Sequence, residues 1–169
     1  MTNDSLDATA IVNALNKHGV RYVVIGAFAA IAQRAPVPAT RDIDFTPDTT
    51  ADNLNRLSAA LKELDARIRS DAVADGLPFD HDGASLGKAE FWNLICQYGE
   101  FDISFHPSGF AGGYSELAPG AHSYAVGTEV VSIADLGDVI RSKEAAGRPK
   151  DLQVLPALYR HHRTLEENV

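Results

Sequence analysis

The sequence predicts an α/β (α+β) fold in which a mixed β-sheet is flanked by helices and followed by a helical C-terminus. Apolar residues recur at helical spacing in several segments, most clearly through the leucines of residues 50–64. Short apolar runs separate these segments, as at residues 21–25. Near the end of the chain, Gly147 and Pro149 divide two helical segments, because glycine commonly ends a helix and proline commonly begins one.

In the first half of the chain, helices and strands alternate. Residues 7–18 have the spacing of an amphipathic helix, and residues 21–25 are apolar throughout, as in a strand buried on both faces. Small residues over 27–33 predict a second helix, which the prolines that follow bring to an end. Residues 41–46 alternate as a strand does, and the next helix covers 50–64.

The second half predicts a hairpin and a helical end. Residues 90–97 and 101–106 are apolar runs joined by Tyr98-Gly99-Glu100, which is typical of a β-hairpin. The remaining predicted elements are strands at 66–69, 122–126 and 128–132, helices at 133–146 and 150–165, and Gly-rich loops at 71–88 and 108–121.

The 169 residues predict a single domain over 1–169, with a core over about 5–132 and C-terminal helices over about 133–165. No apolar stretch is long enough to cross a bilayer, so no membrane partner is expected. The acidic start Met1–Asp7 differs from a signal peptide, and the single Cys96 excludes an intrachain disulfide and a zinc site of several thiolates. A cytoplasmic protein is therefore expected. A Gly-x-x-x-x-Gly-Lys phosphate loop is absent.

The formal net charge of -8 disfavours nonspecific coating of nucleic acid. Charge is uneven, however, because residues 141–150 and 159–163 are rich in cations. A basic C-terminal face could therefore still bind a phosphate-bearing ligand.

Asp42 and Asp44 form an Asp-x-Asp pair on a predicted strand. Both side chains point to one face, roughly 6 Å apart. At an effective dielectric of about 20 they repel by about 3 kcal/mol. The pair is therefore either fully solvated or neutralised by cations. A second pair, Asp80 and Asp82, lies in a polar loop and is interpreted as solvated surface.

Asp102 is a third carboxylate on a predicted strand, where the alternate residues Phe101, Ile103 and Phe105 define the buried face. If this strand pairs beside strand 41–46, three carboxylates converge. Such a cluster suits Mg²⁺, and two ions could act on an in-line phosphoryl displacement. The alternative is that Asp102 faces solvent on a half-exposed strand.

These residues resemble a known family. The strand, Gly26 and helix, then Thr40-Arg41-Asp42-Ile43-Asp44-Phe45, then Asp102, resemble the nucleotidyltransferase superfamily that shares the polymerase-β catalytic core. The pattern is most similar to small prokaryotic members related to AbiEii-type toxins. The segment 142–151 is similar to the Lys-rich and Arg-x-Lys-Asp segments of those proteins, and the resemblance spans about residues 20–160.

The resemblance implies a Mg²⁺-dependent enzyme that moves a nucleoside monophosphate from an NTP to an acceptor hydroxyl and releases pyrophosphate. Asp42, Asp44 and Asp102 would form the catalytic metal site, with Asp102 as ligand or base. The expected nucleotide-binding residues are Gly26, Ala27, Thr40, Lys143, Arg148 and Lys150. Alternatively, Lys143, Arg148 and Lys150 could be solvated cations. For Lys143, the dipole of a helix would favour a positive charge near the helix C-terminus.

The acceptor stays open at this level. The toxin-like members imply a tRNA 3′ end, while protein hydroxyls and aminoglycosides are used elsewhere in the superfamily. A non-catalytic nucleotide- or protein-binding module, within a toxin–antitoxin pair, is the competing interpretation. Ala27 favours it, because the family usually has Gly or Ser there and alanine offers no hydroxyl to phosphate.

Overall fold

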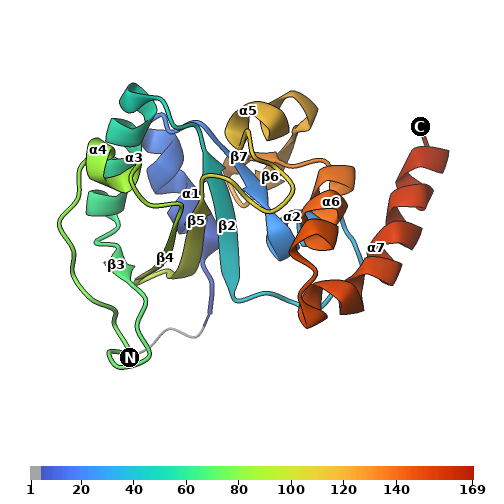
Figure 1. Cartoon of the computed structure of the whole chain (residues 1–169), viewed down its shortest axis with the longest axis horizontal. Helices are drawn as coiled ribbons and strands as arrows, with labels where there is room; N and C mark the ends of the chain where they lie inside the picture. Colours follow the sequence, from blue (N-terminus) through green and yellow to red (C-terminus); the bar gives the residue numbers. More distant parts are fainter. Residues whose placement is uncertain (1–4) are drawn as a thin grey trace.

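The computed structural model describes residues 5–169. Figure 1 shows helices on both sides of a twisted sheet. The helices are α1 (Ala8–Lys17), α2 (Gly26–Ala32), α3 (Ala51–Glu63), α4 (Gly83–Leu86), α5 (Tyr114–Leu117), the 3₁₀ helix η1 (Ala118–Gly120), α6 (Leu136–Ala146) and α7 (Pro149–Glu167). The strands are β1 (Tyr22–Ile25), β2 (Asp42–Pro47), β3 (Arg67–Ile68), β4 (Phe91–Cys96), β5 (Gly99–Ser104), β6 (His122–Val126) and β7 (Glu129–Ile133).

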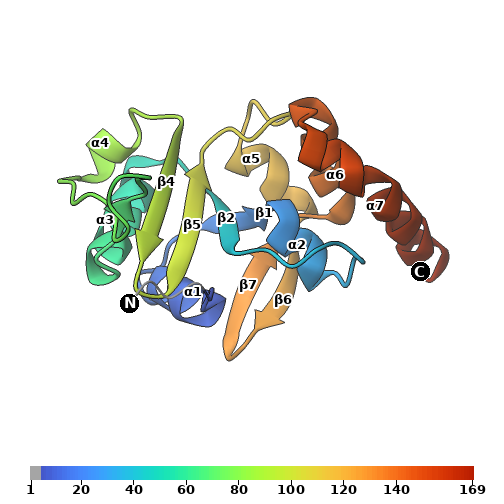
Figure 2. The same cartoon turned by 90° about the horizontal axis from the view of Figure 1, so that it is seen from below.

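The seven strands form one mixed sheet in the order β3-β4-β5-β2-β1-β7-β6, so the predicted mixed α/β architecture is confirmed. β2 pairs parallel with β5 and antiparallel with β1, while β1 pairs parallel with β7. β4 and β5 form the predicted hairpin, with Cys96 opposite Gly99. In the turned view of Figure 2, β5 and β2 lie side by side in the middle of the sheet.

The core lies against the face of the sheet that carries Phe45, Phe101 and Ile103. Leu15 of α1 and Leu57 of α3 contact the same small internal space as these residues, so α1 and α3 cover this face. β1 is buried on both faces, as its continuous apolar run predicts. Alternation along β2 and β5 therefore places their polar residues on the opposite face.

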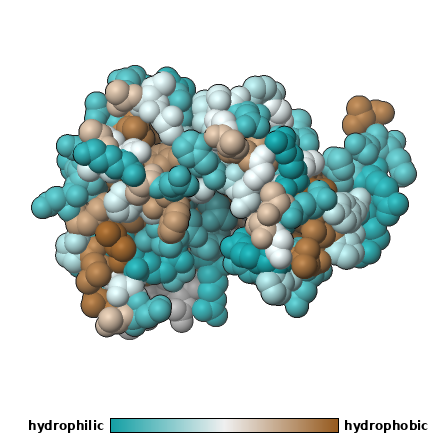
Figure 3. Space-filling view, viewed as in Figure 1, coloured by the Kyte–Doolittle hydropathy of each residue, from teal (hydrophilic) through white to brown (hydrophobic). Residues whose placement is uncertain are grey.

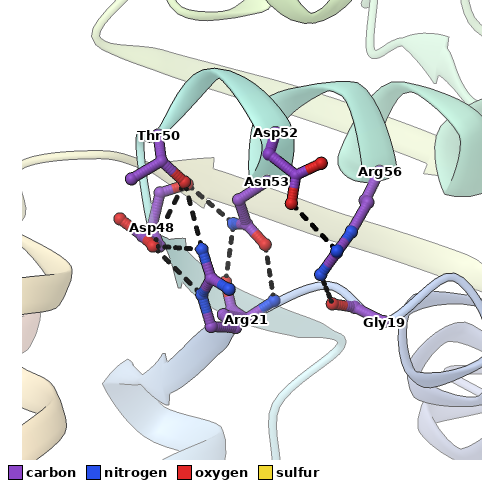
Figure 4. Close-up of polar contacts among 7 residues, drawn as sticks. All are labelled: Gly19, Arg21, Asp48, Thr50, Asp52, Asn53 and Arg56. Atoms are coloured by element: carbon purple, nitrogen blue, oxygen red, sulfur yellow. Dashed lines mark hydrogen bonds and ion pairs between the residues drawn. The ribbon is translucent and has the colours of Figure 1, made fainter.

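A buried asparagine joins the start of β1 to the end of β2 (Figure 4). Asn53 accepts a hydrogen bond from the amide of Arg21 at 2.8 Å, and its amide donates to the carbonyls of Arg21 and Asp48 at 3.0 and 2.7 Å. The side chains of Arg21 and Asp48 form an ion pair at 2.9 Å. These contacts support the pairing of Tyr22 with Pro47, which sets the register of β1 against β2.

Two predicted loops contain short helices. Asp82 accepts a hydrogen bond from the amide of Ser85 at 2.7 Å and caps α4 within 71–88. Segment 108–121 contains α5 and η1. Each of these three helices is about one turn long, too short for a periodic pattern to reveal. The predicted helix at 133–146 begins later, at Leu136, because Ile133 ends β7 and Asp135 caps α6.

No helix within residues 5–169 has the length and apolarity needed to cross a membrane. Residues 1–4, which carry part of the acidic N-terminal segment, lie outside the described residues.

Candidate active site

Three carboxylates converge on the polar face of the sheet. Parallel pairing of β2 with β5 puts Asp44 opposite Asp102, and alternation puts Asp42 on the same face. One oxygen from each carboxylate lies within 4.8 Å of the others. The condition that the sequence left open, pairing of these two strands, is therefore met, and Asp102 belongs to the cluster instead of standing alone in solvent. Hard oxygen donors in this arrangement could hold a divalent cation.

Of the three carboxylates, Asp44 has a strongly raised pKa. Burial, with the charges of Asp42 and Asp102 added, raises the pKa of Asp44 to about 8, and the ammonium of Lys143 opposes the rise. The pKa of Asp102 is also raised, mainly by burial, while the guanidinium of Arg69 acts to lower it. Strongly perturbed carboxylates that share one site favour a functional role for that site.

The turn at Gly26 lies against the cluster. Gly26 has φ +78° and begins α2 directly after β1, and a Cβ at this position would collide with the carboxylate of Asp44. Ala27 follows and is half-buried. The hydroxyl of Thr40 donates to Oδ1 of Asp42 at 2.8 Å and thereby orients that carboxylate.

Lys143 approaches the cluster from α6. Its side chain is 14% exposed, and its ammonium pairs with the buried carboxylate of Asp151 at 3.4 Å. Arg148, at the N-cap of α7, pairs with the same carboxylate at 2.7 Å. Lys143 is thus largely enclosed and near enough to lower the pKa of Asp44, unlike the solvated cation of the alternative interpretation. Arg148 is more exposed, and Lys150 is exposed on the first turn of α7.

Two polar residues beside Asp102 escaped prediction. Arg69, just after β3, pairs with Asp102 and, at 3.2 Å, with Glu100. Both carboxylates face the same side of β5, and Arg69 and Glu100 also line a cavity of about 660 Å³. An arginine at a strand end is common, so local sequence offered no signal. Figure 3 shows hydrophilic residues in the hollow between β2 and the helices α2 and α6.

Comparisons with known proteins identify the fold but no sequence family. No family model matches the chain, and no curated protein matches it. Six chains of solved structures match. The crystal structure of TM1012 from Thermotoga maritima, a candidate nucleotidyltransferase, is 15% identical with a TM-score of 0.52 over 90% of this chain and 89% of that chain.

The solution structure of the antibiotic-resistance factor ANT(2'')-Ia has a TM-score of 0.55 and 12% identity, over 95% of this chain and 89% of that chain. The chain has a nucleotidyltransferase-like fold. Identities this low leave activity and substrate to be argued from the site itself.

Proposed function

We propose that this protein is a Mg²⁺-dependent nucleotidyltransferase acting as a single domain. The observation that carries the proposal is the convergence of Asp42, Asp44 and Asp102 within 4.8 Å, on the fold that TM1012 and ANT(2'')-Ia share. The reaction would move a nucleoside monophosphate from an NTP to an acceptor hydroxyl and release pyrophosphate.

The three carboxylates fit a divalent metal site. They offer hard oxygen ligands, and burial of three acidic groups together leaves negative charge that a cation would neutralise. Asp42 and Asp44 would hold the ions, two of them in the full site, and Asp102 would complete the site or accept the proton of the attacking hydroxyl. Bound Mg²⁺ would neutralise phosphate charge and polarise the reacting phosphoryl group.

The nucleotide would lie on the α2 and α6 side of the cluster. Lys143 is held by Asp151 and acts electrostatically on Asp44, which supports a role for its ammonium in pairing with a phosphate. Arg148 and Lys150 lie at the start of α7 and would extend this cationic side. The turn at Gly26 and Ala27 would let the backbone approach a phosphate. Thr40 would contribute indirectly, because its hydroxyl orients the carboxylate of Asp42.

Positioning and charge neutralisation would supply most of the rate enhancement. The acceptor hydroxyl would attack the α-phosphorus, its proton would pass to Asp102 or, where Asp102 is a metal ligand, to solvent water, and the bond to the bridging oxygen of pyrophosphate would break. This chain's residues would orient the NTP and hold the two reacting groups in line.

The resemblance to AbiEii-type toxins favours a tRNA 3′ end as acceptor, with the basic C-terminal face as docking surface. The net charge of -8 and the fold shared with ANT(2'')-Ia favour a small acceptor such as an aminoglycoside. Salt dependence separates the two classes, because RNA binding weakens steeply with added salt. A cytoplasmic location, supported by the single cysteine, is part of the proposal.

The test is incubation with each α-labelled NTP, Mg²⁺ and either total tRNA or a panel of aminoglycosides, followed by detection of labelled acceptor. Asp44→Asn should lower the transfer rate at least about 100-fold, since it removes a metal ligand. Asp80→Asn is the matched control, because Asp80 belongs to the surface Asp-x-Asp pair.

Calorimetry with NTP and Mg²⁺, combined with the labelling assay, distinguishes the enzyme from the non-catalytic module. A protein that binds NTP through Asp44 but labels no acceptor would be the non-catalytic module, and an antitoxin-like partner would then be sought. Absence of any NTP and metal binding by the wild-type protein would contradict the enzyme and the nucleotide-binding module, and would leave the protein-binding module.

A further inference from the structure

Arg69 reaches the carboxylate cluster from the β3 edge of the sheet. Its amide donates to the carbonyl of Asn93 at 2.9 Å, and Asn93 on β4 lies opposite Asp102 on β5. Arg69, Asn93, Asp102 and Asp44 therefore form one row across the strands. Arg69 thus lies at one end of a row that contains two of the three carboxylates.

The guanidinium of Arg69 bridges two carboxylates of β5. Nη2 pairs with Oδ1 of Asp102, and Nη1 pairs with Oε2 of Glu100 at 3.2 Å. Nε is buried and has no hydrogen-bond partner within residues 5–169. Within residues 5–169, the guanidinium thus makes its polar contacts through its two terminal nitrogens, and their fixed spacing sets the position of the Asp102 carboxylate relative to that of Glu100.

We propose that Arg69 is a positioning residue for Asp102. By holding Oδ1, it fixes the rotation of the carboxylate and leaves the second oxygen for a metal ion shared with Asp42 and Asp44. The proposal rests on the proposed function, because it assigns Asp102 a metal-binding role. Partners of metal ligands usually orient those ligands, and their loss commonly lowers metal affinity or activity 10–100-fold.

The competing explanation is charge alone, with Arg69 acting only to offset the negative charge of the cluster. Lysine separates the two, because it keeps the positive charge but has one ammonium in place of a planar fork and cannot bridge Asp102 and Glu100 in the same way. If charge alone matters, Arg69→Lys should behave as wild type. If geometry matters, it should not.

Arg67 supplies a matched control. It lies two residues earlier, lines the same cavity and pairs with Asp65 at 3.5 Å, a residue outside the carboxylate cluster. Arg67→Lys repeats the same chemical change without touching the cluster. Glu100→Gln is a second test, because it weakens the other anchor of the Arg69 guanidinium and leaves the arginine in place.

The experiment measures Mn²⁺ binding to the full chain by calorimetry, with no nucleotide present. The expected result for Arg69→Lys is a dissociation constant 10–100-fold above that of wild type. Glu100→Gln should shift it in the same direction by a smaller factor, and Arg67→Lys should leave it unchanged. In Mn²⁺-soaked crystals, Asp102 should ligate the ion in wild type and lose that contact in Arg69→Lys.

Unchanged or tighter Mn²⁺ binding by Arg69→Lys would overturn the positioning role, and tighter binding would show that Arg69 competes with the metal. If Arg69→Lys does not fold, Glu100→Gln decides in the same way. Wild-type protein that binds no Mn²⁺ would overturn the metal site itself. Where transfer activity is measurable, kcat should fall 10–100-fold with little change in KM for the NTP, because the Lys143 side is untouched.

Discussion

Gly26 and Asp44 are in direct contact, and the contact requires a residue without a side chain. A Cβ on Gly26 would overlap Oδ2 of Asp44 and lie 3.2 Å from its Cγ, and Gly26 has φ +78°. Thus the turn that ends β1 and the carboxylate of β2 constrain each other.

Gly26→Ala should therefore destabilise the protein and displace Asp44. A left-handed backbone costs about 1–2 kcal/mol for a residue with a side chain, and the overlap with Asp44 adds to this. Gly147→Ala is the control, since Gly147 has φ +61° but its nearest neighbour would lie 3.7 Å from the new Cβ. Denaturant unfolding and Mn²⁺ calorimetry check both, and equal metal affinity in the two variants would contradict this view of Gly26.

Thr40→Ala should weaken metal binding several-fold. The variant removes the 2.8 Å hydrogen bond that orients Asp42, while leaving all three carboxylates in place. Thr40→Ser keeps the hydroxyl and should restore wild-type affinity in the same Mn²⁺ titration. If the serine variant is as weak as the alanine variant, the methyl group and not the hydrogen bond is what matters.

Asp151→Asn should destabilise the fold by roughly 3 kcal/mol, because it leaves Lys143 and Arg148 without the buried carboxylate that they share. It should also raise KM for the NTP, since Lys143 is no longer held. Lys150→Gln, which removes an exposed charge on the first turn of α7, is the control for the stability effect only. Urea unfolding and steady-state kinetics measure the two effects.

The stability effect of Asp151 should depend on pH. Interactions with Arg148 and Lys143 outweigh burial and lower the pKa of Asp151, so its charged form stabilises the folded state. The advantage of wild type over Asp151→Asn is fully present above about pH 4 and is lost as pH falls through the lowered pKa. A difference that persists in strong acid would contradict this.

Asp44 should show the opposite dependence in metal-free protein. Its pKa is raised to about 8, so the folded state holds a proton that the unfolded chain releases near pH 4. Stability attributable to Asp44 should therefore fall between about pH 4 and 8, by up to about 1.4 kcal/mol per pH unit. Asp44→Asn should remove this slope in unfolding measured with chelator, and Mn²⁺ should restore wild-type stability at pH 8.

Much of the architecture follows from local patterns. The apolar run of β1, the leucines of α3 and the Gly147-Arg148-Pro149 boundary predict elements that the structure contains. Local patterns failed where an element is a single turn, as in α4 and α5, since one turn shows no period. The surface position predicted for the second pair, Asp80 and Asp82, is also confirmed.

By itself, the sequence determined which residues share a face of each strand, because alternation along β2 and β5 is a local property. This alternation places Asp42 and Asp44 on one face of β2. It also places Asp102 on the face of β5 that is turned away from the buried Phe101 and Ile103. Only the tertiary structure decided that β2 and β5 are neighbours in the register that puts Asp44 opposite Asp102. It also decided that Arg69 meets Asp102 and that Asp151 holds Lys143, because these contacts join elements distant in sequence through packing that no local pattern encodes.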